Sequence, residues 1–313
     1  MEIGKNDYGI VARLASELVK NRKIVPASQD QTRIALLIID AQNTFCHPEC
    51  ADLLVPGAWE DNQRLASFIK DNLERLTAIE VSLDTHTPMQ IFHPMFWVDA
   101  QGNHPKPFTG ITIEDVTNGT WRINPEVGKR FGKSDEWLHD YALYYTDRLG
   151  RLDIWPYHAL IGSPGHALDW RIEEAVFLHS LARQTRSSGV LKGMRPFTEF
   201  YSVIGPEVLT AHDGTVVGTT NIELRERLID YHTLIVAGQA KSHCVRRTLE
   251  HITEYIRYFD CPVSGRIYFL DDCSSSVPGF EQKADEAFQH FAAAGVHIVK
   301  STLPMDQWPD IEL

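Results

Sequence analysis

The segment LIVAGQAKSHCVRRT, residues 234–248, decides how the rest of the chain is interpreted. It opens with an apolar, β-branched run that is typical of a buried strand, and Gly238 ends that run. Apolar residues then recur at helical spacing from Ser242 onward, at Val245, Leu249 and Ile252. Cys244 is therefore expected in the first turn of a helix, at the carboxyl end of a central strand. The helix dipole would favour ionisation of a thiol there, and open α/β sheets bind their ligands at this edge.

Two further apolar runs also end in residues that can do chemistry. Residues 35–39 precede Asp40, and a carboxylate at the end of a wholly apolar strand is costly unless something there uses it. A weaker run, residues 189–191, precedes Lys192. Each residue alone has an ordinary explanation: Asp40 as a turn cap, Lys192 as a surface lysine and Cys244 as a buried structural cysteine. Together, a base, a cation and a nucleophile at three strand ends predict a catalytic group.

Outward from these runs, strand and helix patterns alternate along the chain. Strands are expected over residues 34–39, 78–83, 189–192, 233–237, 266–270 and 296–299. Helices are expected over residues 60–76, 166–185, 221–229, 243–258 and 280–294. Such alternation predicts the α/β class, with a mostly parallel six-stranded sheet between two layers of helices, a three-layer α/β/α arrangement.

Two segments fall outside this alternation. Residues 1–32 are expected as an N-terminal extension, with a helical pattern over residues 8–19, and residues 33–313 as one domain. Within that domain, residues 95–153 mix many aromatic residues with Gly, Pro and charges. A structureless loop of this length is unusual in a compact domain, so we expect an inserted subdomain with its own small core. A lid over a binding site and a contact between subunits both stay open as its role.

Composition restricts the partners. The chain has 313 residues and a net charge of −12 without a basic run, which argues against nucleic acid or an anionic membrane as a partner. No stretch approaches the ~20 apolar residues that a membrane span needs, and the N-terminus shows no signal-peptide pattern. Five cysteines at irregular spacings fit reduced thiols better than a disulfide framework. We expect a cytoplasmic protein that binds a small-molecule amide, and a homo-oligomer is expected as well.

A second group of residues has the composition of a metal site. Asp84 and His86 follow an apolar strand, and residues two apart on an extended segment point the same way. His158 follows the insertion, in the sequence WPYH. Two imidazoles and a carboxylate suit zinc, iron or manganese, with coordination positions left open. His93 is a candidate fourth ligand that the spacing favours less. Four other histidines are expected not to be ligands: His47, His104, His166 and His243.

The chain resembles the isochorismatase-like cysteine hydrolases and, within them, the nicotinamidases. The matching pieces run in family order and are residues 37–45, 82–86, 155–158, 192–193, 237–245 and 271–300. The resemblance implies the isochorismatase-like hydrolase fold and a catalytic triad of Asp40, Lys192 and Cys244. It also implies a cis peptide bond between Gln239 and Ala240, with the N–H groups of Ala240 and Cys244 binding the oxyanion.

The same resemblance implies a cofactor and a reaction. One divalent metal ion, zinc first and iron or manganese as alternatives, would bind Asp84, His86 and His158. The aromatic residues Phe45 and Trp155 would flank a planar heteroaromatic ring. The implied reaction is hydrolysis of a primary carboxamide, nicotinamide to nicotinate and ammonia, through a thioester intermediate.

The chain also departs from the nicotinamidase pattern. Ser242 and Thr44 stand where an aspartate is frequent, and Lys241 replaces a small polar residue. These departures and the insertion leave the substrate open more than the chemistry. One alternative is a related cysteine amidohydrolase acting on an N-carbamoyl or ureido compound, and another is a non-catalytic binding protein of the same fold. Isochorismatase-type vinyl-ether hydrolysis is disfavoured, because those enzymes typically lack the cysteine found at Cys244.

Overall fold

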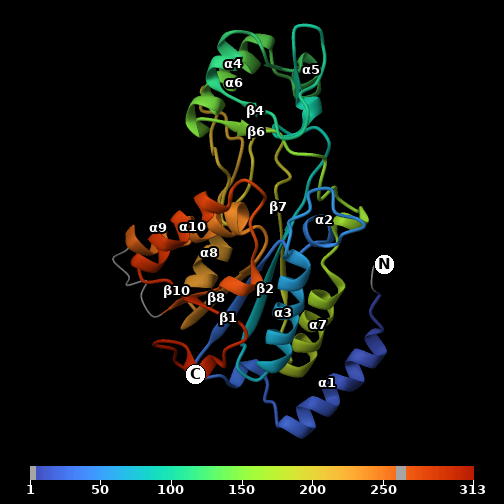
Figure 1. The fold of residues 1–313 in the computed structure, drawn as a ribbon, viewed down its shortest axis with the longest axis vertical. Helices are drawn as coiled ribbons and strands as arrows, with labels where there is room; N and C mark the ends of the chain where they lie inside the picture. The colour runs from blue at the N-terminus through green and yellow to red at the C-terminus, as the bar shows by residue number, and fades with distance from the viewer. Residues whose placement is uncertain (1–4, 259–265) are drawn as a thin grey trace.

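A parallel sheet organises the chain. The computed structural model describes residues 5–258 and 266–313, and its main sheet has six parallel strands in the order β10-β9-β8-β1-β2-β7. The strands are β1 (Ile34–Ile39), β2 (Ala78–Asp84), β7 (Ser188–Lys192), β8 (Thr233–Gly238), β9 (Ile267–Leu270) and β10 (His297–Val299). Helices flank this sheet on both sides (Figure 1), so the predicted three-layer α/β/α class is confirmed.

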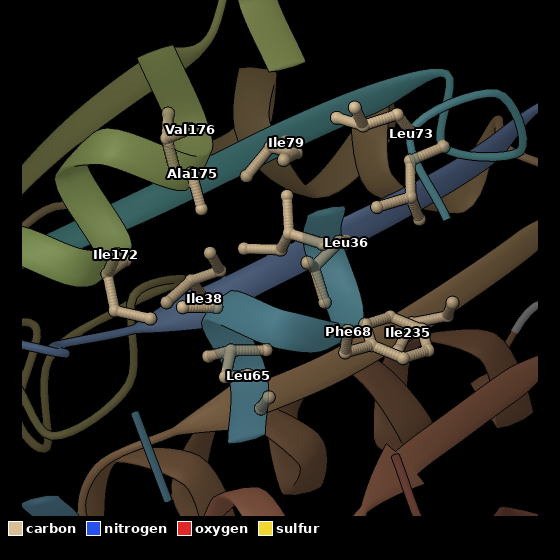
Figure 2. Packing of buried hydrophobic residues seen from close by; sticks show 14 of the residues in the cluster. Leu36, Ile38, Leu65, Phe68, Leu73, Ile79, Ile172, Ala175, Val176 and Ile235 are labelled. Carbon is tan, nitrogen blue, oxygen red and sulfur yellow. The ribbon is translucent and has the colours of Figure 1, made fainter. Parts of the chain in front are cut away.

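Alternate residues of β1 face two separate hydrophobic cores, as the two-residue period of a strand requires. Leu36 and Ile38 pack into the core formed with α1 (Tyr8–Arg22), α3 (Ala58–Asp71) and α7 (Trp170–Arg183). Leu37 packs into the core formed with α8 (Ile222–Ile229), α9 (Arg246–Tyr258) and α10 (Glu281–Ala293). Figure 2 shows the first core, where Leu65 of α3 and Ile172 of α7 lie around the β1 side chains. Burial on both faces explains why β1 is apolar throughout.

The insertion forms a head that projects beyond the carboxyl edge of the sheet (Figure 1). It contains β3 (Trp97–Val98), β4 (Gly110–Ile111), α4 (Ile113–Thr117), β5 (Arg122–Ile123), α5 (Pro125–Phe131), α6 (Asp135–Leu149) and β6 (Leu152–Asp153). Two small antiparallel ladders, β3 with β5 and β4 with β6, hold these elements together. Residues 95–153 therefore contain secondary structure of their own, although none of the strands exceeds two residues.

The core of this head is shared with a second long connection, residues 193–221 between β7 and α8. Phe197, Val208, Ala211 and Val217 of that connection are buried in the same cluster as Tyr141 and Tyr145 of α6. The Tyr141 hydroxyl donates to the Phe197 carbonyl at 2.5 Å, and the Glu199 N–H donates to the Tyr145 hydroxyl at 3.0 Å. The expectation that the insertion has its own core is therefore wrong. The aromatic side chains of the insertion pack against the second connection and also against residues of the hydrolase core, among them Phe45 and Val55.

Two expectations about membranes and cysteines have simple outcomes. Within the two described ranges, none of the helices combines the length and apolar character that a membrane crossing requires. Cys46, Cys50, Cys244 and Cys273 are free thiols. Cys261 lies outside the described residues.

Candidate active site

The carboxyl ends of β1, β7 and β8 bring Asp40, Lys192 and Cys244 together. Nζ of Lys192 lies 2.9 Å from Oδ2 of Asp40 and 3.5 Å from Sγ of Cys244. All three side chains are buried. A carboxylate, an ammonium and a thiol are thus in contact at the edge where parallel α/β sheets bind their ligands.

Ser82 orients the carboxylate of Asp40. Its hydroxyl donates to Oδ1 of Asp40 at 2.6 Å and accepts from the Asp40 N–H at 3.1 Å. Oδ2 of Asp40 is left to face Lys192. The sequence reasoning missed Ser82, although a signal was present: it lies two residues before Asp84 on β2, so strand alternation directs both side chains to the same side.

The surroundings of Cys244 differ from the predicted ones. Cys244 lies in a π-helical turn, Lys241–Val245, that precedes α9. Burial raises the pKa of the Cys244 thiol well above its usual value, and the charge of Lys192 offsets this only in part. Burial of the thiol therefore opposes the easy ionisation that the sequence predicts here. A thiolate would add a negative charge beside the carboxyl groups of Asp40 and Asp84, at a buried position.

Lys192 is the cation that holds this site together. Its Nζ also lies 2.9 Å from Oδ1 of Asp84 and donates to the Phe200 carbonyl at 2.8 Å. Burial opposes the charge of the ammonium, but Asp40 and Asp84 outweigh burial and raise the pKa of Lys192 well above its usual value. Burial also raises the pKa of Asp40, against the attraction of Lys192.

The predicted metal ligands Asp84, His86 and His158 also converge. One ligand atom from each lies within 4.8 Å of the others, and all three side chains are buried. Oδ2 of Asp84 lies 2.9 Å from Nε2 of His86 and 3.6 Å from Nε2 of His158. Burial opposes the charge of Asp84, but His86 and Lys192 outweigh it and hold the pKa of this carboxyl well below its usual value.

The hydrogen bonds of the histidines fit a cation between these groups. Nδ1 of His86 contacts the Gly193 carbonyl at 3.2 Å, and Nδ1 of His158 contacts the Pro156 carbonyl at 2.8 Å. Because a carbonyl only accepts, each Nδ1 carries the proton. In a neutral His86, the lone pair of Nε2 then faces the carboxylate of Asp84, so two acceptors confront each other. A proton or a metal ion between them removes that conflict.

His93 lies closer to this group than its spacing indicates. Its ring centroid is 5.7 Å from that of His86 and 5.8 Å from that of His158. Its Nδ1 contacts the Thr87 carbonyl at 3.0 Å, whereas its Nε2 is buried and finds no hydrogen bond within the described ranges. Burial, with the charges of His158 and His86, lowers the pKa of His93 to about 2, so the ring is neutral and offers a lone pair. A buried, unpaired imidazole nitrogen of this kind suits a ligand role.

Phe45 and Trp155 both lie beside the candidate site. The ring of Phe45 is 5.7 Å from that of His158, and the ring of Trp155 is 5.2 Å from that of His243, the residue before Cys244. Both side chains belong to the same buried cluster. The indole N–H of Trp155 donates to the Tyr201 hydroxyl at 2.9 Å, which satisfies its polar atom.

Hydrogen bonds of the Gln239 side chain hold the turn before Cys244 in place. The peptide bond between Gln239 and Ala240 is cis. The Gln239 amide donates to Oδ2 of Asp61 at 3.1 Å and accepts from the Ser275 N–H at 3.2 Å. The Ala240 N–H finds no hydrogen-bond acceptor among residues 5–258 and 266–313. It is therefore a donor that a ligand at Cys244 can use.

Comparisons with known proteins agree with this architecture. No protein-family model matches the chain, and no curated protein matches it in sequence. Its structure resembles a solved Acinetobacter baumanii nicotinamidase/pyrazinamidase with a TM-score of 0.56 and 18% identity, over 88% of this chain and 98% of that one. It also resembles the yeast nicotinamidase with a TM-score of 0.54 and 17% identity, over 85% of this chain and 99% of that one. This chain has the isochorismatase-like hydrolase fold. The resemblance seen in the motifs is thus confirmed for the fold.

Within this isochorismatase-like fold, three further residues lie near the nucleophile. Glu199 and Tyr201 lie in the connection after β7, and His243 lies beside Cys244. Burial raises the pKa of the Glu199 carboxyl to about 8. Sequence reasoning missed Glu199 and Tyr201, because no periodic pattern marks residues 193–221. Nδ1 of His243 contacts the Ser242 hydroxyl at 2.8 Å.

Proposed function

We propose that this protein is a metal-containing cysteine amidohydrolase that converts a primary carboxamide to a carboxylic acid and ammonia, with nicotinamide as the first candidate. One observation carries the proposal: Lys192 lies 2.9 Å from Asp40 and 3.5 Å from Cys244 in a buried site at the carboxyl edge of the sheet. The base, the cation and the nucleophile of an amide hydrolysis are then all in contact.

The raised pKa of the Cys244 thiol determines how the reaction begins. In the proposed reaction the buried Cys244 starts as a thiol and loses its proton as it attacks the amide carbon. Asp40 accepts that proton, and Lys192 offsets the negative charge while the proton moves. Ser82 keeps Oδ1 of Asp40 occupied, which leaves Oδ2 to do this work.

The bonds then change in two halves. Sulfur bonds to the amide carbon, and the N–H groups of Ala240 and Cys244 stabilise the oxyanion, each worth ~3–4 kcal/mol in comparable sites. The C–N bond breaks as Asp40 returns the proton to the leaving nitrogen, which gives ammonia and a thioester. Asp40 next takes a proton from water, whose oxygen bonds to the acyl carbon. The C–S bond then breaks as Asp40 returns that proton to the sulfur. The products are the carboxylic acid and the free thiol of Cys244.

The same site offers a place for a metal ion and a ring. Asp84, His86 and His158 would hold one divalent ion, zinc first and iron or manganese as alternatives, with His93 as a candidate fourth ligand. When bound, such an ion supplies a Lewis-acidic centre that can accept a lone pair of the substrate.

Phe45 and Trp155 support a planar substrate. Their buried rings lie near His158 and His243 respectively, and would flank a heteroaromatic ring. A solved complex of the yeast nicotinamidase with the inhibitor nicotinaldehyde shares this fold, with a TM-score of 0.55 and 16% identity over 85% of this chain and 99% of that one. Nicotinamide is therefore the first amide to test.

Ammonia release from a panel of amides tests the proposal. The panel contains nicotinamide, pyrazinamide, benzamide and an N-carbamoyl amino acid, with Cys244→Ala as the matched inactive variant. We expect release from at least one primary carboxamide and none from the variant. Release from the N-carbamoyl compound alone would favour the ureido-type alternative. No release from any amide by the metal-loaded protein would favour a binding protein and contradict the proposal.

A further inference from the structure

A charged cavity lies directly beside the nucleophile turn. It has a volume of about 290 Å³, close to the lower limit of small-molecule sites. Four parts of the chain line it, which contribute Arg148 at the end of α6, Tyr201 after β7, His243 before Cys244 and Lys283 in α10. The insertion, the second connection and the hydrolase core therefore all meet at this cavity.

His243 lines the cavity and also contacts Trp155, beside which the proposed ring would lie. Its imidazole is 5.2 Å from the ring of Trp155 on one side, and 5.3 Å and 4.6 Å from the rings of Tyr201 and Phe280. Tyr201, Phe280 and His243 also line the cavity, whereas Trp155 does not. A substituent that extends from the amide past His243 would therefore enter the cavity.

The cavity carries a surplus of positive charge. Five cationic side chains and four carboxyl groups line it, in a protein whose net charge is −12. Most of the arginines are paired: Arg151 with Asp153 at 2.7 Å, Arg247 with Glu207 at 3.0 Å, and Arg246 with Glu250.

Two cations at the rim are not paired in this way. Neither Arg148 nor Lys283 forms an ion pair within the described parts of the chain, and Arg148 lies over the ring of Tyr144 at 4.8 Å. The positive charges of the lining act on His243. Burial lowers the pKa of His243 to about 3, and the charges of Arg246 and Lys283 contribute to this shift.

We propose that this cavity binds an anionic group, a carboxylate or a phosphate, carried by the substrate at some distance from its scissile amide. Arginine offers a planar fork that matches both groups, and lysine adds a point charge. The inference rests on the proposed amide hydrolysis, and it deepens that function by assigning the class of substrate. The insertion then has a role in recognition, because it supplies Arg148.

Matched amides test this assignment. The probes are benzamide, 3-carbamoylbenzoate, 3-carbamoylphenyl phosphate and 3-(aminomethyl)benzamide, which share one scissile group and differ in charge. We expect kcat/KM to be highest for an anionic amide. The ratio of kcat/KM for the anionic amide to kcat/KM for benzamide should fall roughly tenfold in a double Arg148→Gln, Lys283→Gln variant. The ratio should stay unchanged in Lys129→Gln, a control in the exposed part of α5. Comparison of the carboxylate with the phosphate distinguishes the two anions.

A binding measurement separates this inference from the proposed function. Titration calorimetry of 3-carbamoylbenzoate and 3-carbamoylphenyl phosphate into Cys244→Ala needs no turnover. One outcome is that no amide is hydrolysed but an anionic probe binds, and that the double change weakens this binding while Lys129→Gln does not. The anion site then stands, and the proposed amide hydrolysis fails. If benzamide is hydrolysed without preference for the anionic amides, or if the cationic amide is preferred, the anion site is overturned. Absence of both turnover and binding also overturns it.

Discussion

Oδ1 of Asp84 accepts a hydrogen bond from Nζ of Lys192 at 2.9 Å. The other oxygen of the same carboxylate lies 2.9 Å from Nε2 of His86. One side chain is therefore shared by the candidate triad and the candidate metal ligands. A change of charge in either group is felt by the other through this carboxylate, over contacts buried away from water.

Lys192→Met should destabilise the protein, because it leaves the buried carboxyl groups of Asp40 and Asp84 without their cation. We expect the free energy of unfolding in urea to fall by about 3–5 kcal/mol. Cys244→Ala, the matched control, should cost only about 1 kcal/mol. Adding Asp40→Asn to Lys192→Met should restore part of the loss, since it removes one uncompensated charge. Equal stability of Lys192→Met and Cys244→Ala would show that Lys192 is not needed to hold the acids.

Removal of the nucleophile or of its base should abolish amide hydrolysis. We expect Cys244→Ala to lower kcat by about 10⁴-fold or more, and Asp40→Asn to lower it nearly as much. Because the two act on one proton transfer, the double variant should be no worse than Cys244→Ala alone. Ammonia release measures these losses. If the fold loss in kcat of the double variant equals the product of the two single losses, Asp40 is not the proton acceptor.

Metal content should depend on three histidines and not on others. Elemental analysis of freshly purified protein should find a divalent ion. His86→Ala and His158→Ala should each lower the affinity of the protein for this ion by at least 10–100-fold. His93→Ala should reduce it as well if the buried Nε2 is a ligand. His104→Ala is the matched control, because Nδ1 of His104 contacts the Trp97 carbonyl within the head. A metal-free protein with full activity would refute the site.

His179 should make stability depend on pH. It is fully buried, and its Nε2 contacts the Leu76 carbonyl at 2.9 Å. Burial lowers its pKa to about 4, below the ~6.5 of an unfolded chain. The unfolded state therefore binds the proton first as pH falls, so this stability is complete above about pH 6.5 and is lost toward pH 4. The loss should reach about 3 kcal/mol. His179→Gln should flatten this dependence in urea titrations at pH 7 and pH 4.5, whereas an unchanged slope would exclude His179.

Local patterns predict that Asp40, Lys192 and Cys244 lie close together, and the reason lies in strand burial. β1 and β8 are neighbours buried on both faces, so their sequences are unbroken apolar runs whose ends are easy to recognise. Asp40 follows the first run, and Cys244 lies in the turn after the second. Because parallel strands end at the same edge, the position along the chain is enough to bring the residues together.

The features that the sequence does not predict depend on contacts between distant segments. The pKa of Cys244 is raised because the site is buried by several elements, and no local pattern reports that burial. Glu199 and Tyr201 lie in residues 193–221, where no strand or helix period marks their positions. Their placement depends on packing against α6, which lies about fifty residues earlier in the chain.

Removal of the Tyr141 hydroxyl should weaken the attachment of residues 193–221 to the head. Replacing residues 95–153 with a linker does not test the role of the insertion cleanly. The replacement would also expose Phe197 and Val217, which are buried against the insertion. Tyr141→Phe removes only the hydrogen bond to the Phe197 carbonyl and should cost about 1–2 kcal/mol. Tyr144→Phe, three residues along the same helix and only partly buried, is the matched control.

We expect Tyr141→Phe to increase proteolysis within residues 193–221, since that connection loses an attachment to α6. Tyr201 lies in this connection and bonds to Trp155, so looser packing should raise KM for an amide substrate more than it lowers kcat. Tyr144→Phe should change neither the cleavage pattern nor KM. If both variants behave alike, the hydroxyl of Tyr141 does not couple the head to the site, and the two connections meet only by apolar packing.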